Sequence, residues 1–388
     1  MSVTAPVGFT AAGIACGIKP SGDPDLSLVA TADGQPVAAA AVFTQNKMTA
    51  APVVTTNAHL TLTGSRAAAV VLNSGCANAA TGPAGVADAQ ATCAAVAAEL
   101  GCATDDVLVC STGLIGYRLP MDAILAGIPA LVAARSVDGG ADAAEAIRTT
   151  DTHRKEAIAE GEGFVVGGMA KGAAMLAPNM ATMLAVLTTD AAVEPARLSE
   201  VLRAAVADSF NALSTDGCTS TNDTVILLAS GAAGPPADAG SFAAAVASVC
   251  LELATQMAGD AEGHTKVVEV RVSGALSDEE ARAGARKVAE SQLVKCSWYG
   301  RDPYWGRVAS ELGTAGIAFE PDKLTVRYGD LVLAEGGVSA PVDEAALGAY
   351  MAGDRLVVAA HLGMGDGNAR ILTNDLTHAY IDENMGTS

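Results

Sequence analysis

Residues 171–190 read KGAAMLAPNMATMLAVLTTD, and this stretch decides the fold that we expect for the chain. Small residues and a Pro-Asn pair typical of a turn come first. The apolar run MLAVLTT at 183–189 follows at once and predicts a buried strand. A threonine, Thr182, therefore stands where a turn enters a central strand.

Two interpretations of Thr182 are open from its position alone. The ordinary one is a β-branched strand residue. The other is a nucleophile at a chain break, between Ala181 and Thr182. A new α-amine would then lie within reach of the threonine's own hydroxyl, and its pKa of about 7.7–8.0 suits a base near neutral pH. That chemistry requires no histidine.

Strand-like and helix-like segments alternate on both sides of this strand. We expect strands at 37–44 (VAAAAVFT), 52–56 (PVVTT), 67–73 (AAAVVLN) and 106–112 (DVLVCST), and helices at 84–100, at 121–134, from Pro195 and from a cap at Ser241. Strands between helices predict layers of helix against sheet. A doubly wound parallel fold and an αββα sandwich both remain open on this evidence.

The pattern changes toward the C-terminus. KVVEVRV at 266–272 alternates as a strand does, and the capping box that starts at Ser277 opens a charged helix to about Gln292. Short strands dominate from about residue 323 onward. We therefore expect a first domain over 1–280 and a smaller α/β domain over 281–388.

Charge and composition exclude several classes of protein. The chain has 388 residues, half of them hydrophobic, and 43 acidic against 23 basic residues give a net charge of −20. Such a chain lacks the basic face that nucleic acids or anionic membranes require. It shows neither a run of 18 apolar residues nor a signal peptide, so we expect a cytoplasmic protein with no membrane span. The spacing of its five histidines predicts no metal site.

A second candidate site is STGLIG at 111–116, which directly follows the strand-like DVLVC. A strand that ends in Thr-Gly presents a hydroxyl and a backbone N–H at its tip, and both suit an oxyanion. An ordinary glycine turn is the simpler interpretation of this segment alone. The polar cluster TTDT at 149–152 is a third candidate, against a solvated turn.

Taken together, these segments resemble the ornithine acetyltransferase (ArgJ) family, also called glutamate N-acetyltransferase. The resemblance covers nearly the whole chain. Its segments, in the family's order, are NSGCANAATG (73–82), STGLIG (111–116), TTDT (149–152), KGAAMLAPNMATMLA (171–185), GDAEGHTK (259–266), GRDPYWGR (300–307) and DLTHAYIDENMGTS (375–388). Two departures, Cys76 and Tyr304 in place of asparagine, fall in these loops.

The resemblance implies a fold, a maturation step and a reaction. Family members are N-terminal-nucleophile-like αββα sandwiches of the DmpA/ornithine acetyltransferase type. This chain would cut itself before Thr182 into an α chain, 1–181, and a β chain, 182–388, that stay associated, in an (αβ)2 or higher homo-oligomer. The family moves an acetyl group from N2-acetylornithine to glutamate in arginine biosynthesis. No cofactor is implied, and acetyl-CoA is a candidate co-substrate because some members accept it.

The resemblance also implies residue roles. Thr182 would be the nucleophile and carry the acetyl ester, and the Thr112 hydroxyl and Gly113 N–H would hold the oxyanion. Substrate would be bound by six residues, of which the last two are C-terminal contacts: Thr149, Lys171, Thr182, Glu262, Asn384 and Ser388.

Three alternatives stay open at this point. A self-processing aminopeptidase or amidase of the same fold would pass the acyl group to water. A paralogous acetyltransferase of a specialised-metabolite pathway would share every core motif. A non-catalytic α/β binding protein would remain a single uncut chain.

Overall fold

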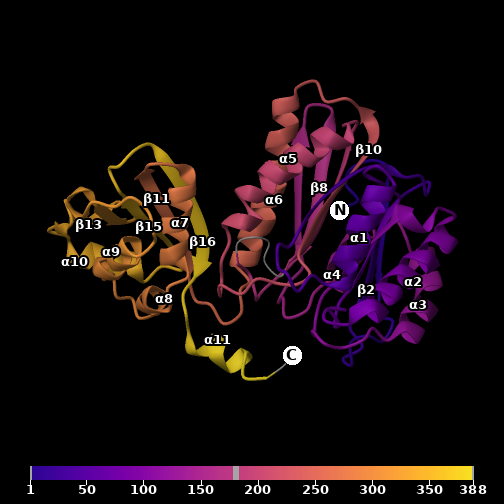
Figure 1. Cartoon of the computed structure of the whole chain (residues 1–388), viewed down its shortest axis with the longest axis horizontal. Helices are drawn as coiled ribbons and strands as arrows, with labels where there is room; N and C mark the ends of the chain where they lie inside the picture. Colours follow the sequence, from indigo (N-terminus) through magenta and orange to yellow (C-terminus); the bar gives the residue numbers. More distant parts are fainter. Residues whose placement is uncertain (1, 178–182, 387–388) are drawn as a thin grey trace. The chain divides into compact units, whose positions relative to one another are not determined.

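The computed structural model describes residues 2–177 and 183–386, which form two compact units (Figure 1). The first unit contains the described residues of Met1–Asn211 and Cys218–Met257. The second contains Ala212–Gly217 and the described residues of Ala258–Thr387. It begins before the boundary that we expected near 280, because the strand at Val267–Ala275 lies inside the sheet of the second unit.

Two sheets make up the centre of the first unit. The four-stranded sheet has the order β1 (Phe9–Ile14), β2 (Leu26–Thr31), β5 (Ala69–Asn73), β6 (Val107–Ser111). The six-stranded sheet has the order β4 (Arg66–Ala67), β3 (Val37–Phe43), β10 (Thr224–Gly234), β9 (Leu184–Ala191), β8 (Phe164–Lys171), β7 (Lys155–Gly161). The pairs β5–β6 and β9–β10 are parallel and the other pairs are antiparallel.

Side chains alternate along these strands, so that each sheet buries both faces. In β6, Leu108 and Cys110 join the core between the two sheets, together with Val186 of β9 and Ile226 of β10. The neighbouring Val109 points to the opposite face, where it packs with residues of α2 and α3.

Helices cover the outer faces of both sheets (Figure 1). The four-stranded sheet carries α2 (Gly82–Leu100) and α3 (Met121–Ala133), and the six-stranded sheet carries α5 (Pro195–Ala207) and α6 (Ala239–Ala258). A short helix, α4 (Gly140–Ala146), adds Ala143 and Ala144 to the core between the sheets. The first unit is thus the αββα sandwich, which confirms the expected fold class and removes the doubly wound alternative.

The strand expected at 52–56 is wrong, because these residues begin the helix α1 (Ala51–Leu62). Pro52 stands in the first turn, where a proline favours a helix start. One face of the helix then meets the edge strand β6: the Thr56 hydroxyl donates to the Val109 carbonyl at 2.7 Å and the His59 ring lies 2.8 Å from the Val107 carbonyl. These contacts occupy a sheet edge that would otherwise be unpaired.

The helix α6 begins two residues before the expected cap at Ser241. The Asp238 carboxylate, not the Ser241 hydroxyl, accepts a hydrogen bond there, from the Ser241 N–H at 2.6 Å. By length and composition α6 is also apolar enough to cross a membrane, and half of its most apolar window is buried inside the protein. Val249 and Leu253 of α6 lie against Gly168 of β8, as in a core helix.

The second unit is a sheet with helices packed against it. Its strand order is β14 (Val338–Ser339), β13 (Leu331–Glu335), β12 (Thr325–Tyr328), β15 (Arg355–His361), β11 (Val267–Ala275), β16 (Gly367–Asn374). Its helices are α7 (Asp278–Ala289), α8 (Gln292–Tyr299), α9 (Trp305–Gly313), α10 (Glu344–Met351) and α11 (His378–Glu383). Half of the expected capping box is present: the Ser277 hydroxyl accepts the Glu280 N–H, whereas the Glu280 carboxylate accepts the Ala318 N–H at 3.2 Å. Trp298 and Tyr328 lie fully buried in the core.

Candidate active site

The predicted oxyanion residues follow directly after β6. Thr112 is buried and its N–H donates to the Asn73 carbonyl at 2.9 Å. Gly113 has a φ of +127°, and a Cβ there would lie 2.3 Å from the carbonyl carbon of Gly75. Only glycine therefore fits at position 113. The departure at Cys76, in the 73–82 segment, lies against this loop, because Cys76 forms a β-bridge with Thr112.

Lys171 lies at the end of β8 and brings two of the predicted residues together. Its buried ammonium nitrogen is 2.7 Å from the Thr149 hydroxyl oxygen and 3.3 Å from the Thr112 hydroxyl oxygen. An ammonium can only donate, so each threonine oxygen is the acceptor. The hydroxyl protons of Thr112 and Thr149 are consequently directed away from Lys171 and are available to a further acceptor.

A buried carboxylate that we did not single out, Asp151, supports this arrangement. It accepts from the Lys155 ammonium at 2.6 Å, the Gly172 N–H at 2.7 Å and the Thr149 N–H at 3.1 Å. Its Oδ2 lies 3.9 Å from the Lys171 nitrogen. The TTDT cluster contains Asp151, but only the fold shows that it faces two lysines.

The electrostatics of Asp151 favour its ionised form. Burial alone would raise the pKa of this carboxyl, but the ammonium groups of Lys171 and Lys155 and the Gly172 N–H outweigh burial and hold the pKa well below its usual range. Asp151 is therefore an anion that orients Thr149 by its backbone and Lys171 by its charge.

The remaining predicted residues fall into two groups. Glu262 and Asn384 meet within the second unit, where the Asn384 side-chain amide donates to Glu262 Oε2 at 2.8 Å. The amide also donates to the Tyr380 carbonyl at 2.9 Å, which holds it on α11. The cleavage-site residues Ala181 and Thr182, and the C-terminal Ser388, lie outside the described residues.

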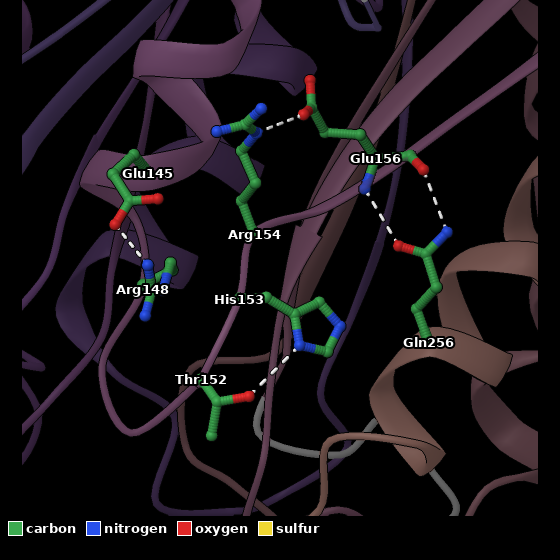
Figure 2. Close-up of a pocket in the computed structure, with 7 residues that line it drawn as sticks. All are labelled: Glu145, Arg148, Thr152, His153, Arg154, Glu156 and Gln256. Carbon is green, nitrogen blue, oxygen red and sulfur yellow. Dashed lines mark hydrogen bonds and ion pairs between the residues drawn. The ribbon is translucent and has the colours of Figure 1, made fainter.

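A polar hollow of about 520 Å³ lies beside the Thr149–Asp151 turn (Figure 2). It is lined by Glu145, Arg148, Thr152, His153, Arg154, Glu156 and Gln256. Its two arginines are already engaged, Arg148 with Glu145 and Arg154 with Glu156. The Arg148 guanidinium also donates to the Asp151 carbonyl, at 3.1 and 2.7 Å, so this side of the hollow braces the turn.

Metal-ligating side chains do not cluster in the part of the chain that the structure describes, where no three or more His, Cys, Asp or Glu residues are placed to hold an ion.

Comparison with known proteins identifies the family. A profile of the ArgJ family matches residues 10–386. The chain belongs to the ArgJ family. An arginine biosynthesis bifunctional protein ArgJ from Thermobifida fusca is 48% identical to this ArgJ chain over the full length of both. One from Mycobacterium tuberculosis is 50% identical over all of this chain and 96% of its own length.

A solved ArgJ relative is the ornithine acetyltransferase of Mycobacterium tuberculosis, whose crystal structure was determined as a complex with ornithine. It is 49% identical over 46% of this chain and 94% of the solved chain, with a TM-score of 0.41. The resemblance that the motifs indicated is thus confirmed by the family profile and by relatives of the same length.

Proposed function

We propose that this protein transfers the acetyl group of N2-acetyl-L-ornithine to L-glutamate through an acetyl ester on Thr182. The products are ornithine and N-acetylglutamate, as the cyclic pathway of arginine biosynthesis requires. As a member of the ArgJ family the protein is an acyltransferase of arginine biosynthesis. The observation that carries the proposal within the site is the buried Lys171, which donates to both Thr149 and Thr112.

Lys171 suits the group that donor and acceptor have in common. Acetylornithine, the donor, and glutamate, the acceptor, share an α-carboxylate and an α-nitrogen that bears the acetyl group before or after transfer, and they differ in the charge of the side chain. We assign the shared α-carboxylate to the Lys171 ammonium and the Thr149 hydroxyl. Charge-assisted hydrogen bonds of this kind are the strong ones in a buried site.

The chemical steps follow from the residues. The Thr182 hydroxyl attacks the acetyl carbonyl, and the freed α-amine of Thr182 takes the hydroxyl proton. Negative charge then builds up on the carbonyl oxygen, which the Thr112 hydroxyl and the Gly113 N–H stabilise. The intermediate collapses, the amine returns the proton to the departing α-nitrogen of ornithine, and acetyl-Thr182 remains. Glutamate attacks this ester by the reverse sequence.

The other predicted residues complete the proposal. We assign Glu262, held by Asn384, to a substrate ammonium, and Ser388 to a further substrate contact. Maturation by cleavage between Ala181 and Thr182 is part of the mechanism, because only that cut supplies the α-amine. We propose that the reaction needs no cofactor and that acetyl-CoA serves as a second acetyl donor. We also propose that the protein is cytoplasmic and forms an (αβ)2 or larger homo-oligomer.

Acetyl transfer with a panel of acceptors tests the proposal. The purified protein should convert acetylornithine and glutamate to ornithine and acetylglutamate, with parallel double-reciprocal lines. Release of free acetate as the main product would favour the amidase alternative, and preference for an acceptor other than glutamate would favour a specialised paralogue. A single uncut chain with no transfer would favour a binding protein.

A further inference from the structure

Asp223 is a fully buried acidic residue whose side chain contacts the backbone of the residue that follows the proposed nucleophile. It stands immediately before β10, and its Oδ1 accepts a hydrogen bond from the Met183 N–H at 2.9 Å. Met183 stands immediately before β9. The parallel pairing of β9 with β10 starts at Leu184 and Thr224, so the Met183 N–H takes a side-chain oxygen as its acceptor.

The position of this N–H gives the contact its meaning. The nitrogen of Met183 is bonded to the carbonyl carbon of Thr182, and the atoms of a peptide unit lie in one plane from one Cα to the next. Holding the Met183 N–H therefore restrains the peptide unit by which Met183 is bonded to Thr182. Both the α-amine and the hydroxyl-bearing side chain of Thr182 leave from the Thr182 Cα.

The backbone of Asp223 is fixed as well. Its carbonyl accepts the Thr44 N–H at 2.9 Å, and the next residue, Thr224, donates its N–H to the Met183 carbonyl at 3.3 Å. Asp223 is thus attached to β9 on one side and to the segment after β3 on the other. Such a frame meets the requirement that a reacting group be held by residues that are themselves rigid.

The chemical state of Asp223 is unusual for a structural carboxyl. Burial raises its pKa well above the ordinary value, against the opposing effects of the Met183 N–H, the Ser220 hydroxyl and the Lys171 charge. Its Oδ2 is buried and accepts no hydrogen bond from the described residues. A buried polar group without full satisfaction costs stability, but an apolar residue at 223 would leave the Met183 N–H without its acceptor. The carboxyl of Asp223 therefore serves the backbone immediately before β9.

We propose that Asp223 is a positioning residue for Thr182: by accepting the Met183 N–H it orients the peptide unit that carries the nucleophile, for self-cleavage and for acetyl transfer. This inference rests on the proposed function of Thr182. It extends that function by naming the side chain that holds the nucleophile from its C-terminal side.

Three variants of the full chain separate positioning from simple stabilisation. Asp223→Asn keeps an oxygen acceptor at the same place, and Asp223→Leu removes it. Asp190→Leu is the matched control, because Asp190 is a buried acid at the opposite end of β9 that accepts the Val165 N–H at 2.8 Å and the Val7 N–H at 3.2 Å. Asp223→Ser, with a shorter side chain, serves if the leucine variant does not fold.

Self-cleavage is followed by denaturing mass spectrometry during cell-free synthesis, and kcat and KM are measured per mole of cleaved chain. A misplacement near 1 Å can cost about 10²-fold in rate, so Asp223→Leu or Asp223→Ser should slow cleavage and lower kcat by at least about tenfold, with KM nearly unchanged. Asp223→Asn should stay within about threefold of the wild type in both rates. Asp190→Leu should lower the unfolding temperature yet cleave at the wild-type rate.

The inference is overturned if a folded Asp223→Leu or Asp223→Ser protein cleaves and turns over like the wild type. It is equally overturned if Asp190→Leu slows cleavage as much, because the effect would then be one of stability. Failure of the wild-type protein itself to cleave or to transfer acetyl would instead refute the proposed function, so the two failures are distinguishable.

Discussion

Replacing Thr112 by valine tests the oxyanion assignment most sharply. Valine keeps the β-branched shape of this buried residue and deletes only the hydroxyl. The oxygen of that hydroxyl already accepts a hydrogen bond from the Lys171 ammonium at 3.3 Å, so the hydroxyl is left to donate its proton to the substrate. Loss of one oxyanion donor typically lowers kcat by about 10²–10³, or roughly 2.7–4 kcal/mol.

Substrate affinity should change little in Thr112→Val. Lys171 retains its shorter contact of 2.7 Å with Thr149 and its 3.9 Å separation from Asp151 Oδ2, so its ammonium stays in place. The stability cost should be about 1 kcal/mol, the usual net value of one hydrogen bond. Single-turnover formation of the acetyl-enzyme, together with steady-state KM, measures the two effects separately.

Thr56→Val provides the matched control for this variant. Thr56 is a buried threonine whose hydroxyl donates to the Val109 carbonyl at 2.7 Å and accepts the Val109 N–H at 2.8 Å, on the same strand that leads to Thr112. This control should lose about 1–3 kcal/mol of stability and keep its kcat. A fall in kcat of less than about threefold in Thr112→Val would refute the oxyanion role, since one donor is worth far more.

Three further predictions concern maturation, binding and pH. Thr182→Ala should appear as one full-length chain on denaturing mass spectrometry and should show no transferase activity. An uncut but active wild-type protein would defeat the mechanism in which the α-amine acts as the base. Lys171→Met should lower kcat/KM for acetylornithine and for glutamate alike, by about 10- to 150-fold, the equivalent of 1.5–3 kcal/mol for a charged hydrogen bond. A fall in kcat/KM for only one of the two substrates would contradict the role of Lys171 at the shared carboxylate. Burial lowers the pKa of Lys295 from 10.5 to about 8, so between pH 8 and 10.5 the unfolded chain still binds the proton that the folded chain has lost. The free energy of unfolding should therefore rise over this range, by at most about 1.4 kcal/mol per pH unit. Denaturant titrations of wild type and Lys295→Met should show that difference, and parallel pH profiles would rule it out.

Much of the fold could be predicted because its elements follow local rules. The apolar run AAAVVLN reflects a strand that is buried on both faces, and the alternation in KVVEVRV reflects a strand with two distinct faces. The Ser277 N-cap marks the start of a helix by a hydrogen bond within four residues. PVVTT misled because β-branched residues favour strands in general, whereas here tertiary contacts of α1 with β6 override that preference.

The site was only partly predictable for a related reason. Thr112, Gly113, Thr149 and Lys171 were found through motifs of the family, and the structure brings the side chains of three of them together. The roles of Asp151 and Asp223 depend on contacts between distant parts of the chain. An isolated aspartate before a strand or in a polar turn carries no local signal of such a contact.

The same limit applies to the domain boundary near 280. The helix after Ser277 marked a visible change in composition, and we placed the boundary there. The contacts that define the second unit, however, include the pairing of β11 with β15 and β16. Those partners come from more than 80 residues later in the chain, and register between them cannot be read from either segment alone.

The acetyl-enzyme is the central claim of this account, and its direct measurement is the mass of the β chain. Wild-type protein is incubated with acetylornithine without glutamate, denatured in acid and examined by intact mass spectrometry. We predict that the fragment beginning at Thr182 gains the mass of one acetyl group, that fragmentation places this group on Thr182, and that added glutamate removes it. Turnover of acetylornithine and glutamate with no acetylated β chain at any time would contradict the covalent mechanism and require direct transfer between the two substrates.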